Sequence, residues 1–251
     1  MTGEPLLEAT SLRLTEPTRS FGFQLASGEI VGLAGLDGHG QAAFLEALAG
    51  VRAPVAGTVE AIRDGSRHEV RGARDAFAQG IVYLPQDRKN EGIFPSLSVL
   101  DNFRMLTLGR TGRFGFLSPR RDREAFAARR ERLGIVLASP TAPITSLSGG
   151  NQQKVLLARL LEARPRVMLL NDPTRGVDHP TRLALFALFE ELAHESGLAV
   201  VVLSTEIDEI VSHCHRAVVF REGAPSAELD QPALTMDAVL AAMFGQVGVA
   251  S

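Results

Sequence analysis

The chain has 251 residues, 45% of them hydrophobic, so it can bury a substantial core and is expected to form one domain with an inserted part. Its net charge of −3 argues against broad electrostatic capture of nucleic acid or of an anionic membrane surface. No apolar run approaches the roughly 18 residues that span a bilayer, and the N-terminus lacks a signal-peptide pattern. A single cysteine, Cys214, excludes an internal disulfide framework, so these features predict a soluble cytoplasmic protein.

The first third of the chain has the pattern of strands followed by a loop and a helix. Phe21, Phe23 and Leu25 alternate with polar or small residues, which indicates a half-buried strand. A short apolar strand is expected over residues 29–34, and a glycine-rich loop over 35–40 leads from it into a helix. A strand, a short helix and a second strand are then expected at 58–62, 73–79 and 81–84.

Residues 90–146 differ in composition from the chain on either side, with Arg-rich helical segments such as 122–133 between prolines. Helices and strands alternate again after this segment, with expected elements at 151–163, 167–170, 181–193, 199–204, 206–211, 217–220 and 236–244. Continuous apolar strands separated by helices imply a mostly parallel sheet that is covered on both faces. The pattern predicts an α/β fold with a core formed by 1–89 and 147–251 and an inserted helical subdomain formed by 90–146.

Residues 147–154 read Leu-Ser-Gly-Gly-Asn-Gln-Gln-Lys and lead into the helix expected at 151–163. A helix that starts in this way directs unpaired backbone N–H groups and its positive dipole end at whatever lies in front of it. Gly149 and Gly150 let a ligand approach closely, and Ser148 adds a side-chain donor. The ligand that suits this arrangement is a phosphate.

Residues 35–43, Gly-Leu-Asp-Gly-His-Gly-Gln-Ala-Ala, lie between a predicted strand and a predicted helix, where a phosphate-binding P-loop belongs. An intact P-loop continues with lysine, which meets the phosphates, and then with a hydroxyl residue, which holds Mg²⁺. Gln41 and Ala42 occupy these two positions. Gln41 carries no charge and Ala42 cannot coordinate a metal, so a phosphate cradle is expected here but efficient hydrolysis is not.

Polar residues also follow three predicted strands. Residues 83–89 read Tyr-Leu-Pro-Gln-Asp-Arg-Lys, residues 169–178 read Leu-Leu-Asn-Asp-Pro-Thr-Arg-Gly-Val-Asp, and residues 203–206 read Leu-Ser-Thr-Glu. In this order, the motifs resemble those of ATP-binding cassette (ABC) ATPases, in the form typical of the second, degenerate cassette of sugar or nucleoside importers. The resemblance covers about residues 5–223 and implies a P-loop NTPase core of the ABC type. That fold has a mostly parallel sheet, an N-terminal antiparallel β part and a helical insertion that ends at the signature motif, residues 147–154.

The resemblance also implies roles for the residues at the strand ends. Gln86 corresponds to the glutamine that senses metal and water, and it would give a weak Mg²⁺ site at best. Asn171 and Asp172 correspond to the metal-holding acid and to the acid that polarises the attacking water. Asn171 is neutral, and Asp172 has lost one methylene, a shift of about 1 Å that can cost on the order of 10²-fold in rate. Thr205 stands where the family has its switch histidine, and Asp178 matches the aspartate that bridges two subunits.

In the family, the signature motif contacts the nucleotide bound on a partner subunit, and here it is intact while the residues of the chain's own site are altered. Losing one donor to a developing charge typically costs ~10²–10³-fold, so the chain's own site should be nearly silent. We expect Asp172, Gln86 and Thr205 to form a weakened catalytic site, with Ser148 and Gly150 acting in trans. The expected contacts to ATP, with weakly bound Mg²⁺, are Gly35, Asp37, Gly38, Gly40, Gln41, Ala42, Ala43, Asn171, Ser148, Gly149, Gly150 and Asp178.

The expected partners are a second cassette in a head-to-tail homo- or heterodimer, a membrane permease and, indirectly, a solute-binding protein, but no nucleic acid. The expected location is the cytoplasm, peripheral to the inner face of the cell membrane. Two alternatives stay open, a soluble ABC ATPase without a transport role and a non-hydrolysing scaffold subunit. His213, Cys214 and His215 look like a metal cluster, but adjacent residues do not converge easily on one ion.

Overall fold

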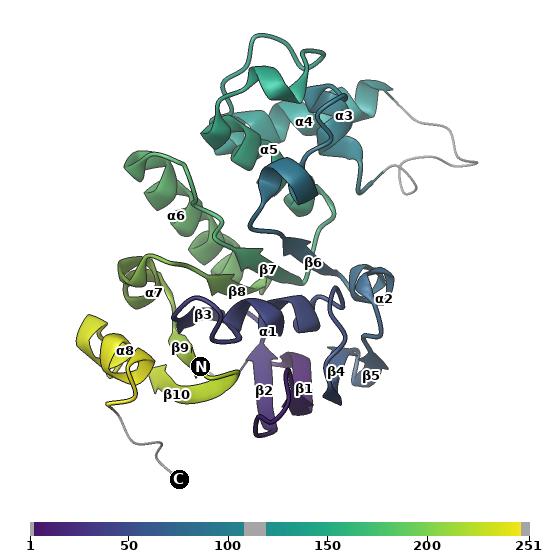
Figure 1. Ribbon diagram of the computed structural model, residues 1–251. Helices are drawn as coiled ribbons and strands as arrows, with labels where there is room; N and C mark the ends of the chain where they lie inside the picture. Colours follow the sequence, from purple (N-terminus) through teal and green to yellow (C-terminus); the bar gives the residue numbers. More distant parts are fainter. Residues whose placement is uncertain (1–2, 108–118, 247–251) are drawn as a thin grey trace. The chain divides into compact units, whose positions relative to one another are not determined.

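The computed structural model describes residues 3–107 and 119–246, and the chain divides into two compact units (Figure 1). We call them the sheet unit, made of Met1–Tyr83, Arg166–Pro173 and Leu188–Ser251, and the helical unit, made of Leu84–Pro165 and Thr174–Ala187. Residues 108–118 of the expected insertion lie outside the described residues.

The N-terminal strands of the sheet unit form an antiparallel four-stranded sheet with the order β2-β1-β4-β5. Its strands are β1 (Pro5–Arg13), β2 (Phe21–Ala26), β4 (Ala56–Arg63) and β5 (Ser66–Glu69). In the register, Leu7 pairs with Leu25 on one side and with Ala61 on the other, and all three side chains are buried. The alternation seen in the sequence of β2 therefore directs one of its faces into the core.

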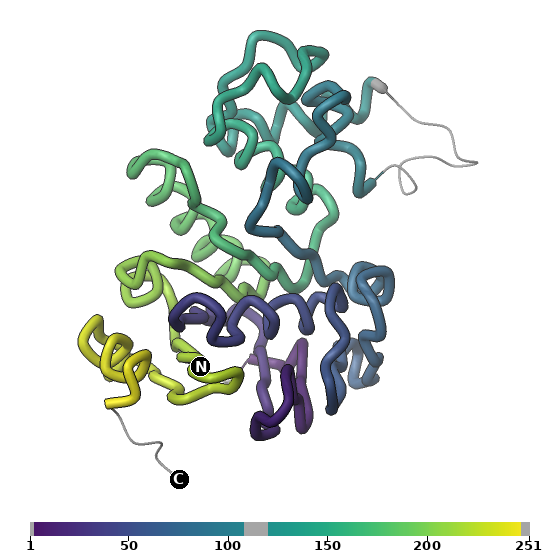
Figure 2. The backbone as a smooth tube through the Cα atoms, in the orientation of Figure 1, coloured from purple at the N-terminus to yellow at the C-terminus, as the bar shows by residue number. Residues whose placement is uncertain are grey.

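The second sheet has the order β10-β9-β3-β8-β7-β6. Its strands are β3 (Ile30–Gly35), β6 (Ile81–Leu84), β7 (Val167–Asn171), β8 (Ala199–Leu203), β9 (Arg216–Arg221) and β10 (Ala224–Asp230). The pairs β3–β8, β3–β9 and β7–β8 are parallel, whereas β10 runs antiparallel to β9. Strands that are far apart in the sequence thus lie side by side, as the trace in Figure 2 shows for β3 and β9.

Helix α1 (Gln41–Leu48) follows β3 and packs on β3, β7 and β8. Phe44, on this helix, is fully buried among aromatic rings, with centroid distances of 5.1 Å to Phe23 and 5.2 Å to Phe220. This aromatic cluster fixes the start of α1 relative to the end of β3, and with it the loop between them. The other helices of this unit are α2 (Ala73–Ala78), α7 (Ile207–His213), α8 (Met236–Met243) and the later part of α6 (His179–Ser196).

The helical unit is built around α5 (Gly149–Glu162), on which α3 (Val99–Arg104) and α4 (Pro119–Leu133) both pack. Phe103 of α3 and Phe126 of α4 are buried edge to face, with ring centroids 5.2 Å apart. A short π-helical segment, η1 (Arg88–Gly92), and a 3₁₀ turn, η3 (Ile144–Ser146), complete the unit. Among the described residues, no helix combines the length and the apolar character needed to cross a membrane.

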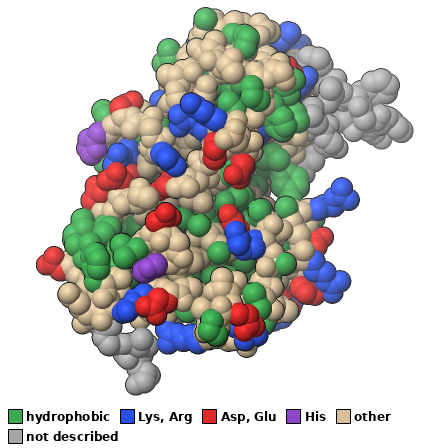
Figure 3. Space-filling model, viewed as in Figure 1, with side chains coloured by type: hydrophobic (Ala, Val, Ile, Leu, Met, Phe, Trp, Pro, Cys, Tyr) green, Lys and Arg blue, Asp and Glu red, His purple; other side chains and the backbone are tan. Residues whose placement is uncertain are grey.

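The expected mixed architecture, with a mostly parallel sheet and an antiparallel N-terminal sheet, is confirmed. Strands β5 and β10 were not expected, because their residues, Ser-Arg-His-Glu and Ala-Pro-Ser-Ala-Glu-Leu-Asp, lack the β-branched and aromatic residues that favour strands. Pairing with a neighbouring strand gives them their conformation. On the face drawn in Figure 3, acidic and basic side chains are interspersed.

Candidate functional site

The loop over residues 35–40 has the backbone of a tight strand-to-helix connection. Gly40, the residue before α1, has a φ of 106°, and a Cβ there would lie 2.9 Å from Cα of Gly223. Glycine is therefore required at this position by its conformation and by close packing. The backbone N–H of His39 donates to the carbonyl of Leu36 (3.0 Å), and the N–H of Gly223 donates to the carbonyl of His39 (3.0 Å). These contacts hold the loop in a tight turn between β3 and α1.

The side chain of Gln41 turns back onto this loop. Its Nε2 donates to the carbonyls of Leu36 (2.9 Å) and Gly35 (3.2 Å), and the residue is 7% exposed. Because both neighbours are carbonyl acceptors, the orientation of the amide is fixed, and Oε1 is buried without a hydrogen-bond partner among the described residues. Both donors of Gln41 thus serve its own loop. Ala42 and Ala43 pack against the hydrophobic core, and Asp37 is exposed.

Asn171 and Asp172 stand at the end of β7, where both residues are buried. Oδ1 of Asn171 has no hydrogen-bond partner among the described residues. Asp172 has a φ of 46°, a left-handed conformation that aspartate tolerates better than most residues. Its N–H donates to the carbonyl of Leu203 (2.8 Å), and its Oδ1 accepts the N–H of Thr205 (3.0 Å). The Asp172 carboxylate therefore joins the ends of β7 and β8, and Thr205 itself is exposed.

These residues fit a phosphate better than they fit Mg²⁺. The loop leads into the N-terminus of α1, and the free N–H groups at a helix N-terminus favour an anion. In contrast, Mg²⁺ prefers carboxylate oxygens and a P-loop hydroxyl, and the chain offers the methyl group of Ala42 and the neutral amide of Asn171. Within the described part of the chain, no group of three or more His, Cys, Asp or Glu side chains could hold a metal ion. The residues at this loop therefore do not fit Mg²⁺.

In the helical unit, the expected trans residues lie at helix N-termini. Ser148 is exposed and precedes α5, and its Oγ accepts hydrogen bonds from the N–H (3.4 Å) and Nδ2 (3.0 Å) of Asn151. Asp178 precedes α6 and accepts from the N–H (2.9 Å) and Oγ1 (3.2 Å) of Thr181. These bonds, the backbone one first, lower the pKa of the Asp178 carboxyl. Gly149 and Gly150 begin α5, and Gln86 is exposed.

The expected site residues thus fall into two sets. Gly35, Gln41, Asn171, Asp172 and Thr205 belong to the sheet unit, together with the remaining residues of the loop. The helical unit holds the others, which are Gln86, Ser148, Gly149, Gly150 and Asp178. Sequence reasoning gave no role to Arg88, which lies against Gly149 and donates through Nη1 to the carbonyl of Arg175 (3.0 Å). No local pattern could have indicated it, because its partners are distant in the sequence.

His213, Cys214 and His215 have separate surroundings. Nδ1 of His213 lies 2.7 Å from Oε1 of Glu190, and Nδ1 of His215 accepts the N–H of Ile30 (2.9 Å). Cys214 is buried, and burial raises the pKa of its thiol. The three side chains do not meet at one point.

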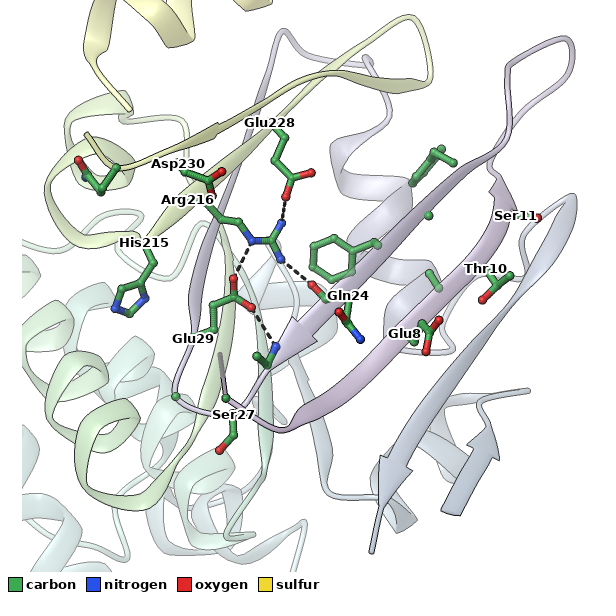
Figure 4. Close-up of a pocket in the computed structure, with 18 of the residues that line it drawn as sticks. Glu8, Thr10, Ser11, Gln24, Ser27, Glu29, His215, Arg216, Glu228 and Asp230 are labelled. Carbon is green, nitrogen blue, oxygen red and sulfur yellow. Dashed lines mark hydrogen bonds and ion pairs between the residues drawn. The ribbon is translucent and has the colours of Figure 1, made fainter. Parts of the chain in front are cut away.

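A cavity of about 1170 Å³ opens between β2, β9 and β10, and none of the residues of the loop 35–43 lines it (Figure 4). Its central feature is Arg216, which contacts the carboxylates of Glu29 (2.6 Å from Nε) and Glu228, and which also donates to the carbonyl of Gln24. The guanidinium lies 5.2 Å from the centroid of the Phe23 ring. Since these partners come from both sheets, the network ties the sheets together rather than presenting a charge to a ligand.

Comparison with protein families places residues 18–175 in the ABC transporter family. The chain is 36% identical over 246 residues to "Ribose import ATP-binding protein RbsA 1" of Rhizobium meliloti, a match that covers 97% of this chain and 48% of that protein. It is 37% identical over 250 residues to "Ribose import ATP-binding protein RbsA 2" of Rubrobacter xylanophilus, covering 98% and 47% respectively. The chain thus spans about half the length of the curated relatives that it matches.

Solved structures of ATP-binding cassettes share the fold. The dimeric post-hydrolysis state of the cassette MJ0796, bound to ADP and Pi, superposes with a TM-score of 0.77 at 21% identity, covering 90% of this chain and 98% of that one. A nucleotide-free cassette from an ABC transporter gives a TM-score of 0.78 at 16% identity, covering 94% and 95%. At these identities the likeness concerns the fold alone, and it agrees with the expected P-loop NTPase core of the ABC type. Taken with the family match, it shows that the chain is an ATP-binding cassette and belongs to the ABC transporter family.

Proposed function

We propose that the chain is the ATP-binding part of an importer for a sugar such as ribose, or for a nucleoside, and that it occupies the position of the second, degenerate cassette. The names of its relatives, ribose import proteins that are about twice as long, support the sugar class. The proposal includes the division into a core of residues 1–89 and 147–251 and a helical subdomain of residues 90–146. It places the protein in the cytoplasm, on the inner face of the membrane, with a permease as its partner there.

In this proposal, the chain's own site binds ATP weakly and hydrolyses it little or not at all. The observation that carries the proposal is the position of Gln41, whose two amide donors are bound to the carbonyls of Gly35 and Leu36. A lysine at this position would bring a charge to the phosphates, whereas Gln41 as placed brings none. The end of β7 agrees with this view, because the Asp172 carboxylate accepts a backbone N–H of the neighbouring strand.

The catalytic contribution of the chain would be made in trans, to ATP on a second cassette paired head-to-tail with this one. ATP bound there supplies the phosphate chemistry. Ser148 is exposed at the cap of α5, where its hydroxyl and the first N–H groups of the helix would donate to the terminal phosphate. Asp178, whose hydrogen bonds with Thr181 lower the pKa of its carboxyl, would meet the partner beside this site. Closure of the pair would then drive the permease, with solute delivered by a binding protein.

The test is ATPase activity of the chain alone and after mixing with a complete cassette encoded beside it. We expect little turnover alone and substantial turnover in the mixture. Ser148→Arg should lower the mixed activity by at least about 10²-fold, because a bulky side chain fills the space in front of α5 and removes a donor. The matched control is Ser146→Arg, which places the same exposed side chain two residues earlier, away from the helix cap, and should leave turnover unchanged.

Two results would contradict the proposal. One is substantial turnover by the chain alone that is lost on Gln41→Ala, which would show a competent site of its own. The other is unchanged turnover of the mixture with Ser148→Arg, which would favour a scaffold role. Failure to co-purify with a polytopic membrane protein would favour the soluble ABC ATPase instead.

A further inference from the structure

The backbone around Arg88 is held firmly within the helical unit. Asp87 caps η1 by accepting the N–H groups of Lys89 (3.0 Å) and Asn90 (3.1 Å). At the other end of η1, the carbonyl of Gly92 accepts a hydrogen bond from Nη2 of the buried Arg159 (2.7 Å). With both ends fixed, the Arg88 side chain projects from a rigid segment rather than from a loose loop.

The guanidinium of Arg88 lies against two glycines from distant parts of the chain. A Cβ on Gly149 would lie 2.2 Å from Nη2 of Arg88, and a Cβ on Gly176 would lie 3.5 Å from Nη1. Nη1 also donates to the carbonyl of Arg175 (3.0 Å). One side chain therefore joins η1, the start of α5 and the loop that leads to Asp178.

Of the two glycines beside Arg88, Gly149 shows more clearly what the contact does. Unlike Gly176, it has no left-handed backbone, so its conformation would allow a side chain. A methyl group there would have to displace the Arg88 guanidinium, which is the flexible end of its side chain. At the neighbouring Gly150, a Cβ would meet only ordinary contacts, the nearest being Cγ1 of Val177 at 3.5 Å. The two glycines of the signature motif thus differ in what an added methyl group would meet.

The charge of Arg88 does not serve the stability of α5. The N-terminus of a helix carries a positive partial charge, which favours anions and disfavours a guanidinium. Nε of Arg88 is buried without a partner among the described residues, so the side chain is placed here at some cost. A positional role accounts for such a contact better than a stabilising one.

We propose that Arg88 is a positioning residue for the ATP site of the partner cassette. By joining Gly149 to the carbonyl of Arg175, it fixes the Ser148 cap and the loop of Asp178 in one arrangement, so that both meet the partner's nucleotide together. This inference rests on the proposed trans function. It assigns to Arg88 a role through other residues, without contact to ATP.

A double-mutant cycle tests the contact in the mixed complex. Arg88→Ala should lower kcat by about tenfold or more, because misplacement of a catalytic group by 1 Å can cost on the order of 10²-fold. The KM for ATP should change by less than about twofold, because the partner's own P-loop binds the nucleotide. Gly149→Ala should have a similar effect alone and a smaller one in the Arg88→Ala background, so that the two effects do not add. Gly150→Ala, the matched control, should have the same effect in both backgrounds. Arg88→Lys should recover only part of kcat, since an ammonium lacks the planar fork.

A second measurement does not depend on ATP. Amide hydrogen exchange on the chain alone should speed up at both 149–152 and 174–178 in Arg88→Ala, with both segments changing together. Unchanged exchange and an additive cycle would overturn the positioning role even if Ser148→Arg abolishes turnover. If exchange speeds up in both segments of Arg88→Ala but kcat is unchanged, the connection between Arg88 and the ATP site is overturned. If Ser148→Arg also has no effect, the proposed trans function has failed instead.

Discussion

The Gln41 side chain binds its own loop at the position where an intact P-loop has a lysine that binds phosphate. Lysine has three donors and a charge, so it can bind loop carbonyls and phosphates at once, whereas glutamine has two donors. Here both go to the carbonyls of Gly35 and Leu36. The Asp172 side chain also bonds to the backbone of the site, since its carboxylate accepts the Thr205 N–H. Asp172 itself has a left-handed backbone conformation. At both positions the side chain bonds to the backbone of the site.

The residue-scale prediction concerns the double substitution Gln41→Lys with Ala42→Thr. It restores the charge and the hydroxyl of an intact P-loop, so ATP affinity should rise by at least about tenfold, or ~1.4 kcal/mol, and should become Mg²⁺-dependent. Titration with a fluorescent ATP analogue, with and without Mg²⁺, measures both effects. Gln246→Lys adds the same charge at an exposed position and should change neither. Equal affinities for the native chain and the double variant would show that Gln41 does not limit binding.

At the scale of elements, side-chain caps decide where the helices begin. Ser98 caps α3, Asp87 caps η1 and Ser148 caps α5, each by accepting a backbone N–H one turn ahead. Asp178 does the same for α6 through Thr181. Such caps satisfy donors that the first turn of a helix leaves unpaired. In this chain two of them, Ser148 and Asp178, are also residues of the proposed trans site.

The element-scale prediction concerns the pH dependence of the α6 cap. Because the pKa of Asp178 is lowered in the folded state, its ionised form stabilises the fold at pH values above the unfolded pKa, and this stability is lost as the pH falls through the folded pKa. Asp178→Ala should therefore lower the melting temperature at pH 7, and the difference from the native chain should shrink below about pH 3. Asp178→Asn keeps the acceptor oxygen, so its melting temperature should vary less with pH. If Asp178→Ala lowers the melting temperature equally at pH 7 and below about pH 3, the assignment of this pH dependence to Asp178 is refuted.

Much of the fold could be predicted from local pattern. The apolar runs of β7 and β8 and the helix after the loop 35–40 were expected, because periodicity and breakers are local signals. Strand β10 was not, since only its pairing with β9 makes it a strand. The same limit applies to the site: motif spacing indicated Gln41 and Ser148, but the position of Arg88 beside Gly149 depends on how η1 and α5 pack.

At the scale of the whole molecule, the chain is one cassette whose relatives are about twice as long. Family membership explains the fold. Under the proposed function, a pair made of this chain and a complete cassette is asymmetric. One of its sites combines an intact P-loop with the signature motif of this chain, and the other contains Gln41.

The whole-molecule prediction concerns nucleotide stoichiometry. The pair should retain one ATP in a tight, Mg²⁺-dependent site. Equilibrium dialysis against labelled ATP, at a low temperature where turnover is slow, counts the bound nucleotides. Chelating Mg²⁺ should release that nucleotide and leave only weak binding. A pair that carries Gln41→Lys with Ala42→Thr should approach two retained nucleotides. Two equal tight sites in the native pair would contradict the asymmetry.

The contact between Arg88 and Gly149 also constrains the order in which mutations can accumulate. A side chain at position 149 would collide with the guanidinium, at 2.2 Å from Nη2, while Arg88 is present. A methyl group at 149 would therefore push the guanidinium away from the Arg175 carbonyl, unless residue 88 had already been shortened. Gly149→Ala is thus less costly after the arginine is lost than before.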